Sequence, residues 1–278
     1  ALLQDLDFLI VQDIFMTKTA GYADVVFPAS VGWVEADGTV TSSERRVQRV
    51  RAALVPPKGA RADHEIIGDL AMRLGATWQA QTPEELWDEL RSISPMHAGM
   101  SYPRLEENNG LQWPCPDLDH PGTPFLHGWL WEEDLLGHDP APFSLTTHEG
   151  PKETLSEEFP IRLTTGRVLD SYNTGVQSRA YKSPLRKGAD LEISTVDALE
   201  LGLQNGEEVL VSSPRGHVKM LVSIQKDQVK GLAFTTFHFP DLVDLNVLTN
   251  DQWDPLSDTA EFKAAAIRIE KLTGDDRA

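Results

Sequence analysis

Residues 164–174 read Thr164-Thr165-Gly166-Arg167-Val168-Leu169-Asp170-Ser171-Tyr172-Asn173-Thr174, directly after an apolar strand pattern at residues 159–163. The stretch combines a turn glycine with hydroxyl, guanidinium and amide side chains. Hydroxyls and backbone N–H groups can bind phosphate oxygens, Gly166 lets a ligand approach the backbone, and Arg167 offers a bidentate fork that lysine lacks. The pattern predicts a strand that ends in a loop able to bind a phosphorylated, heteroatom-rich ligand.

Further short strands follow this loop. Apolar, β-branched runs recur at residues 208–213, 217–222, 231–237 and 264–269. A Pro-Arg-Gly turn joins the first two runs and predicts a hairpin. Thr195 is predicted to cap a short helix that stops near Gly202. Many short strands with one small helix indicate a closed β-barrel.

The beginning of the chain has a different, α/β pattern. Residues 8–11 and 25–27 are short apolar runs suited to buried parallel strands, and residues 16–22 can join them as a helix. Two more helices are predicted, one beginning at His64 and one capped by Thr82 in a capping box.

Residues 96–157 separate the two patterns. They are rich in Pro, Gly, His and Asp, with interspersed Trp, and predict an irregular linker. The predicted fold class is α/β plus β, with a partial α/β domain at residues 1–95 and a β-barrel domain at residues 158–278. Two domains agree with a length of 278 residues, at about 100–200 residues per domain.

Composition argues against several classes of function. A formal net charge of −18 argues against a nucleic-acid binder, whose affinity rests on clustered Lys and Arg. A single cysteine, Cys115, excludes an internal disulfide and an iron–sulfur cluster held by four cysteines of this chain. No apolar run reaches the roughly 20 residues that cross a bilayer. The chain begins without Met inside a strand pattern, which we interpret as the middle of a domain.

Polar residues follow the first strand. Gln12 and Asp13 lie where ligands collect in open α/β sheets, at the carboxyl end of a strand. Asp13 can accept hydrogen bonds from a guanine edge or a ribose diol, or it can cap the next helix. Asp63 presents the same alternatives, and its place before His64 favours capping.

Other polar groups have plainer interpretations. The basic run at residues 44–51 is typical of a solvated face paired with neighbouring acids. Cys115 lies between prolines without a nearby Lys or Arg, and is predicted to be an inert thiol. Four polar residues each suit a turn or a surface, but as a set they can line one groove beside the loop: His238, Asn246, Asn250 and Lys263.

The sequence resembles a known family in seven segments that keep the family's order. They are residues 11–20, 23–28, 35–39 and 44–50, and later residues 164–174, 237–239 and 248–257. These segments are similar to the catalytic subunit of molybdenum- or tungsten-dependent formate dehydrogenases. The wider group is the bis-molybdopterin guanine dinucleotide oxidoreductases.

The resemblance implies a fold, an activity and a cofactor. The first domain would be part of a Rossmann-like α/β domain, and the second a double-psi β-barrel. The intact enzyme would oxidise formate to carbon dioxide at a metal centre, molybdenum or tungsten, held by two molybdopterin guanine dinucleotides. Two alternatives remain: another enzyme of the superfamily, such as a nitrate reductase or a complex I-like subunit, or a non-catalytic cofactor-binding module.

The resemblance also assigns cofactor-binding residues. Gln12, Asp13 and Thr17 would contact one dinucleotide arm, and Asp63 would bind the guanosine of that arm. The other arm would be bound by the loop and by three later residues: Thr165, Gly166, Arg167, Val168, Leu169, Ser171, Tyr172, Asn173, Thr174, His238, Asn246 and Lys263.

The family's catalytic residues and metal ligand have no counterpart in this sequence. The resemblance would place them, together with a 4Fe-4S cluster, in sequence upstream of Ala1, so that no catalytic residue and no metal ligand lies in this chain. It further implies electron-transfer subunits as partners and a cytoplasmic location.

Overall fold

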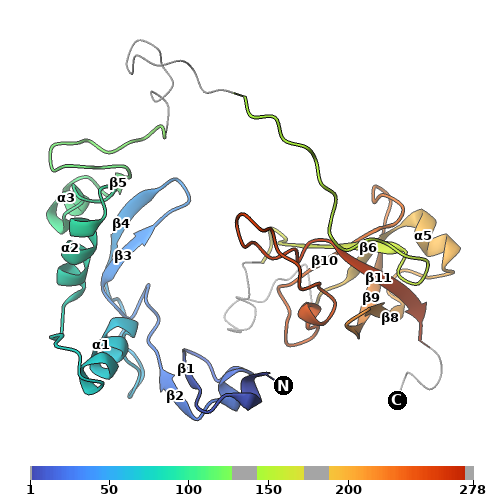
Figure 1. Cartoon of the computed structure of the whole chain (residues 1–278), viewed down its shortest axis with the longest axis horizontal. Coiled ribbons are helices and arrows are strands. Elements are labelled where there is room, and N and C mark those ends of the chain that lie inside the picture. The colour runs from blue at the N-terminus through green and yellow to red at the C-terminus, as the bar shows by residue number, and fades with distance from the viewer. Residues whose placement is uncertain (1, 127–142, 172–187, 273–278) are drawn as a thin grey trace. The chain divides into compact units, whose positions relative to one another are not determined.

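The computed structural model describes residues 2–126, 143–171 and 188–272. The chain forms two compact units, Ala1–Ser144 and Leu145–Ala278 (Figure 1). Within the described ranges, no helix is long and apolar enough to cross a membrane.

A two-stranded parallel sheet lies in the first unit. After η1 (Leu2–Asp5), strand β1 (Ile10–Asp13) pairs with β2 (Val25–Pro28), which confirms the predicted parallel strands. The predicted helix at residues 16–22 is wrong except for its last turn, the 3₁₀ turn η2 (Ala20–Tyr22). Two β-branched threonines and a glycine in that segment disfavour a longer helix.

Two amphipathic helices follow. α1 (Asp63–Arg73) ends before Gly75, whose φ of +96° is the left-handed conformation that closes a helix. The start of α2 (Pro83–Ile93) confirms the predicted capping box. The Glu85 N–H donates to Thr82 Oγ1 at 3.3 Å, and the Thr82 N–H donates to Glu85 Oε2 at 2.7 Å.

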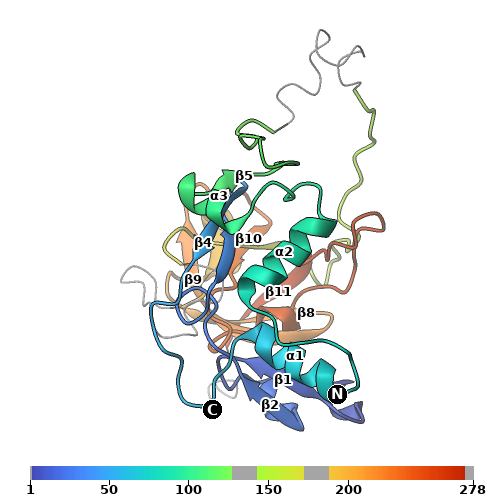
Figure 2. The same cartoon turned by 90° about the vertical axis from the view of Figure 1, so that its left-hand side faces the viewer.

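The first half of the predicted linker is an ordered part of the first unit. α3 (Tyr102–Glu107) and β5 (Leu111–Gln112) lie within it, and β5 completes a sheet with β3 (Gly38–Thr41) and β4 (Arg46–Val50). α3 packs against β4, and α2 against β3 (Figure 2). The prediction of irregular structure is therefore wrong at residues 102–112. The many Pro and Gly residues of the predicted linker suggested irregular structure, but apolar side chains between them are buried in a core. Among these are Met100, Leu105 and Leu111.

Cys115 belongs to the same buried cluster and is fully covered. The sequence shows no arginine near the Cys115 thiol, but the fold brings one there: Arg104 Nη1 lies 3.5 Å from Sγ. The same guanidinium donates to the carbonyl oxygens of Gly99 and His120, at 2.6 and 2.7 Å. Arg104 thus ties three chain segments together around a thiol that solvent does not reach.

The predicted pairing of the basic run at residues 44–51 with neighbouring acids is confirmed for three of its arginines. Arg46 pairs with Glu44, and both Arg49 and Arg51 pair with Glu106 on α3. Arg45 differs, because its guanidinium donates to backbone carbonyl oxygens, among them that of Thr123 at 3.0 Å.

The second unit is a closed six-stranded barrel in the order β10-β6-β11-β8-β9-β7, as the sequence predicted. Its strands are β6 (Ile161–Gly166), β7 (Leu191–Ser194), β8 (Glu208–Ser213), β9 (Gly216–Gln225), β10 (Leu232–Thr236) and β11 (Ala265–Lys271). The β6–β10 and β7–β9 pairs are parallel, and the β8–β9 hairpin is antiparallel as predicted. Alternate residues of β6 are buried, since the barrel interior is filled by one face of each strand.

A short helix, α5 (Thr195–Glu200), follows β7. Its cap is Ser194, whose side chain accepts from the Asp197 N–H at 3.0 Å, so the prediction of Thr195 as the cap is wrong by one residue. Serine and threonine are both good caps, so the residue type alone does not distinguish Ser194 from Thr195. A 3₁₀ turn, η4 (Leu245–Val247), precedes the last strand.

Candidate functional site

Several strand ends meet at one end of the barrel. β6 and β10 run in parallel with Gly166 opposite Thr236, so both strands end there. β11 runs the other way, with Ala265 opposite Leu163, and therefore begins at the same end. The antiparallel register of β8 against β11 brings the β8–β9 turn to this end as well. We call this the loop end of the barrel.

The loop after β6 stays beside the segment after β10. The Arg167 guanidinium carbon lies 5.5 Å from the centre of the Phe237 ring. The Val168 N–H donates to Nε2 of His238 at 3.0 Å, and His238 is fully buried. The structure therefore brings together two parts of the predicted site that lie about 70 residues apart in the chain.

Lys263 lies at the same end. Thr165, on β6, donates its hydroxyl hydrogen to the backbone carbonyl of Phe262 at 3.0 Å, which places the next residue beside the loop. The Lys263 Nζ atom lies 5.9 Å from the centre of the Phe262 ring. A basic side chain thus stands near the strand that leads into the loop.

Asn246 and Asn250 have other surroundings. Asn246 is in η4, next to the β8–β9 turn, and its N–H donates to Asp244 Oδ1 at 3.2 Å. Asn250 donates to Glu261 Oε2 at 3.0 Å. No contact in the described part of the chain joins either residue to the loop. Three further predicted residues lie outside the described ranges: Tyr172, Asn173 and Thr174.

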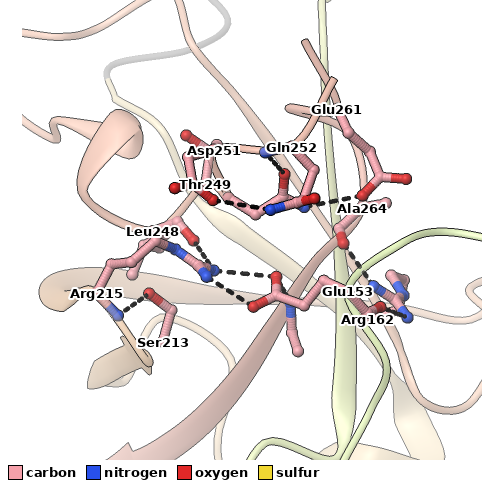
Figure 3. Close-up of polar contacts among 12 residues, drawn as sticks. Glu153, Arg162, Ser213, Arg215, Leu248, Thr249, Asp251, Gln252, Glu261 and Ala264 are labelled. Atoms are coloured by element: carbon pink, nitrogen blue, oxygen red, sulfur yellow. Dashed lines mark hydrogen bonds and ion pairs between the residues drawn. The ribbon is translucent and has the colours of Figure 1, made fainter. Parts of the chain in front are cut away.

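An ion-pair cluster fixes the segment that carries Lys263 (Figure 3). The Glu153 carboxylate accepts from Arg215 Nη1 and Nη2, at 2.7 and 3.0 Å, and from the Ala266 N–H at 2.9 Å. Burial raises the pKa of Glu153, but the hydrogen bonds from Arg215 and Ala266, together with nearby positive charge, outweigh it and hold the pKa below its usual range. Glu153 therefore remains ionised and joins the incoming chain to β11 and to the β8–β9 turn.

The loop end fits a ligand rich in hydrogen-bonding atoms. Gly166 is needed there, because a Cβ at this position would lie 2.9 Å from Phe234 Cε2. The buried hydroxyls of Ser171, Thr235 and Thr236 have no hydrogen-bond partner among the described residues, a property that they share with three hydroxyls of the first unit. Buried polar groups without partners are uncommon in native proteins, and a bound ligand is one way to satisfy them. Sequence analysis missed the two threonines, although Thr-Thr at the end of an apolar strand is a visible signal.

The first unit has its own cluster of predicted residues. Gln12, at the end of β1, donates from Nε2 to Asp63 Oδ1 at 2.5 Å. The capping prediction for Asp63 is wrong, because Asp63 is the first residue of α1 and Ala62 occupies the cap position. The side chain is turned toward β1 instead, so the structure brings together two residues that sequence analysis predicted independently.

Asp13 and Thr17 make local contacts beside this pair. Asp13 Oδ1 accepts from the Phe15 N–H at 2.9 Å, and Thr17 Oγ1 accepts from the Ala20 N–H at 3.1 Å. Both contacts shape the turn between β1 and η2. Each oxygen keeps further acceptor capacity, since a carboxylate has about four lone-pair sites and a hydroxyl two.

Comparison with known families places both clusters inside matched regions. Residues 1–73 match the model described as "Molybdopterin oxidoreductase", and residues 161–266 match the "Molydopterin dinucleotide binding domain". The chain carries regions of both molybdopterin domains. The predicted molybdopterin guanine dinucleotide cofactor agrees with these matches, and the loop end of the barrel falls within the dinucleotide-binding region.

Curated relatives match nearly the whole chain. "F420-dependent formate dehydrogenase 2 subunit alpha" of Methanococcus maripaludis is 43% identical over 274 residues, which are 97% of this chain and 40% of that protein. "F420-dependent formate dehydrogenase subunit alpha" of Methanocaldococcus jannaschii is 38% identical, with the same coverage. The chain thus spans about two fifths of the length of these relatives.

A solved structure agrees with the fold. The acetylene hydratase from Pelobacter acetylenicus is similar to this chain with a TM-score of 0.66 over 97% of this chain and 41% of that one. The sequence identity is 20%, so the likeness concerns the fold alone.

Proposed function

We propose that this chain is the cofactor-binding part of a formate dehydrogenase that oxidises formate to carbon dioxide. The observation that carries the proposal is the identity of 38–43% to three proteins named formate dehydrogenase alpha subunits, which extends over 97% of the chain. The identity includes residues 74–160, which neither family model covers. The similarity to these relatives is therefore not limited to the general cofactor-binding regions.

Each unit would bind one dinucleotide arm. In the first unit, Gln12, Asp13 and Thr17 would contact one arm, and the Asp63 carboxylate would bind the guanosine of that arm. In the second unit, the loop end would bind the pyrophosphate and pterin of the other arm. The residues assigned there are Thr165 to Leu169, Ser171 to Thr174, His238, Asn246 and Lys263.

These residues would act by binding and orientation. The metal centre of the bound cofactor supplies the two-electron chemistry of formate oxidation. Backbone N–H groups and hydroxyls of the loop would hold the pyrophosphate, and Arg167 and Lys263 would balance its negative charge. Fixed hydrogen bonds along the two arms would in turn fix the position of the metal.

The proposal extends to finer features of fold and assembly. The mixed barrel, with parallel pairs β6–β10 and β7–β9, would be a double-psi β-barrel, and the β1–β2 pair with α1 would belong to a Rossmann-like domain. The catalytic residues, the ligand of molybdenum or tungsten and a 4Fe-4S cluster would lie in preceding residues of a longer polypeptide. Electrons would leave through partner subunits.

The test is an activity assay on the natural protein that carries this sequence. Its intact mass is measured first, and formate-dependent reduction is then followed with a viologen dye and with coenzyme F420 as acceptors. We expect a mass well above 30.8 kDa and reduction that depends on formate. A mass near 30.8 kDa, or pterin-loaded protein that does not reduce either acceptor with formate, would contradict the proposal.

Arg167→Ala tests the cofactor assignment of the loop. A charged hydrogen bond contributes about 1.5–3 kcal/mol, so its loss is expected to lower the amount of pterin and metal bound per subunit by tenfold or more at limiting cofactor. Pterin is measured by fluorescence after oxidation, and metal by mass spectrometry. The control is Arg73→Ala, which removes an exposed arginine of α1 paired with Asp69. Equal pterin and metal content in both variants would exclude the role of Arg167.

A further inference from the structure

His238 occupies a place where the β6–β10 ladder would continue. The last pair of the ladder is Thr236 with Gly166, so the same register sets residue 237 beside residue 167 and residue 238 beside residue 168. Both of these pairs are in contact: Phe237 with Arg167, and His238 with the backbone of Val168. The His238 imidazole thus accepts the hydrogen bond of the Val168 N–H beyond the last backbone pair of the β6–β10 ladder.

The direction of this hydrogen bond shows which nitrogen of the His238 ring carries the proton. A backbone N–H can only donate, so Nε2 of His238 must offer a lone pair to Val168. A ring that accepts at Nε2 is neutral and carries its proton on Nδ1. His238 is therefore an acceptor for the loop, and a cationic imidazolium cannot take this role.

His238 lies beneath the loop that it contacts. Its exposed fraction is 0%, whereas Leu169 in the loop is fully exposed and Arg167 is also exposed. Through the hydrogen bond from the Val168 N–H, the buried imidazole can orient a loop whose outer side chains reach solvent.

We propose that His238 is a positioning residue that holds the loop at residues 167–171 in its binding conformation through the hydrogen bond from Val168 to Nε2. The identity of the ligand rests on the proposed function, but the anchoring of the loop does not. This anchoring role is additional to the cofactor contact proposed for His238 above, and it predicts a defect that is present before any ligand is bound.

The experiment compares two substitutions in the full chain without cofactor. His238→Leu fills a similar volume but removes the acceptor, whereas His238→Gln keeps an acceptor oxygen at nearly the same reach. Hydrogen–deuterium exchange of the loop amides is the measurement. We expect the exchange rate of the Val168 amide to rise on the order of tenfold in His238→Leu and to stay within about threefold of wild type in His238→Gln.

Two controls separate loop anchoring from general loss of stability. Ser194→Ala removes a buried hydrogen bond elsewhere in the same unit, from the Asp197 N–H, and should leave exchange at residues 167–171 unchanged. In wild type, the ¹⁵N resonances of His238 should show an unprotonated, hydrogen-bonded Nε2. A protonated Nε2, or a loop that loosens equally in Ser194→Ala and His238→Leu, would overturn the proposal.

A nucleotide probe connects the anchor to the proposed function. Guanosine diphosphate is the nucleotide half of the proposed cofactor, and its binding to the same three chains is measured by calorimetry. We expect the affinity to fall about tenfold in His238→Leu and to recover in His238→Gln. Equal affinity in all three chains together with unchanged loop exchange would overturn the role of His238. If wild type does not bind the nucleotide at all, the proposed function loses support, while the exchange comparison still decides the anchor.

Discussion

Glu153→Gln is expected to destabilise the second unit by about 3 kcal/mol at neutral pH. The carboxylate is 13% exposed and accepts three hydrogen bonds, two of them from Arg215. Glutamine keeps the shape but presents an amide NH₂ to those donors, and it leaves the Arg215 charge without its carboxylate partner. The measurement is urea unfolding of the full chain, with hydrogen exchange used to assign the loss to β8 and β11.

The same substitution predicts a pH dependence. The pKa of Glu153 is lowered in the folded chain, so its ionised form stabilises the fold fully above the unfolded pKa of about 4.3. This contribution is lost as the pH falls below that value and through the lower folded pKa. The difference in unfolding free energy between wild type and Glu153→Gln should therefore be constant from pH 6 to 8 and shrink below about pH 4.

Glu149→Gln is the matched control for this prediction. Glu149 lies in the same segment and pairs with Lys152 Nζ at 2.8 Å, but its side chain is 75% exposed. An exposed pair contributes little to stability, so this variant should unfold like wild type. If both glutamines have the same effect, or if the effect of Glu153→Gln does not change with pH, the buried ion pair is not what holds the strands together.

The features that the sequence predicted correctly depend on short-range signals. The capping box at Thr82 needs only residues three apart, and the Pro-Arg-Gly turn fixes the hairpin between two alternating strands. Barrel closure also followed, because many short strands leave few other ways to bury one face of each. The cap and the hairpin are determined by neighbours in the chain, whereas barrel closure followed from the number and length of the strands.

The features that the sequence did not predict depend on distant contacts. Asp63 has every local property of a cap, but Gln12, which lies 51 residues earlier, meets its carboxylate. Residues 102–112 look irregular because Pro and Gly dominate around them, yet they are packed on β4 through Leu105 and Leu111. Neither outcome can be predicted from the spacing of residues along the chain. Each depends on which distant segment packs against the residue in the folded chain.

The candidate site shows the same division. The loop from Thr165 was visible as a ligand-binding pattern, and His238 and Lys263 were already among the later polar residues predicted to line a groove beside it. The structure adds the register that explains why they meet, with the ends of β6 and β10 and the start of β11 at one end of the barrel. That register also shows that His238 faces the loop backbone, a relation that no sequence pattern specifies.

Gly99→Ala is expected to destabilise the first unit by about 3 kcal/mol. A Cβ at this position would lie 1.8 Å from the carbonyl oxygen of Asp117 and 2.9 Å from Sγ of Cys115. These neighbours cannot move away easily, because the Gly99 N–H donates to the Cys115 carbonyl at 2.7 Å and Arg104 binds the Asp117 carbonyl. Thermal unfolding of the full chain, monitored by tryptophan fluorescence of the first unit, measures the effect.

Gly68→Ala makes the same change in the same unit and should have the opposite effect. A Cβ at Gly68 would meet no atom within 4 Å, and the residue lies inside α1, where alanine favours the helix by about 1 kcal/mol over glycine. The loss at Gly99 would therefore come from steric overlap, since the backbone there is not in the left-handed conformation that glycine alone adopts easily. If Gly99→Ala is as stable as wild type, the segment at residues 114–117 is free to shift, and the close packing around Cys115 does not hold the first unit together.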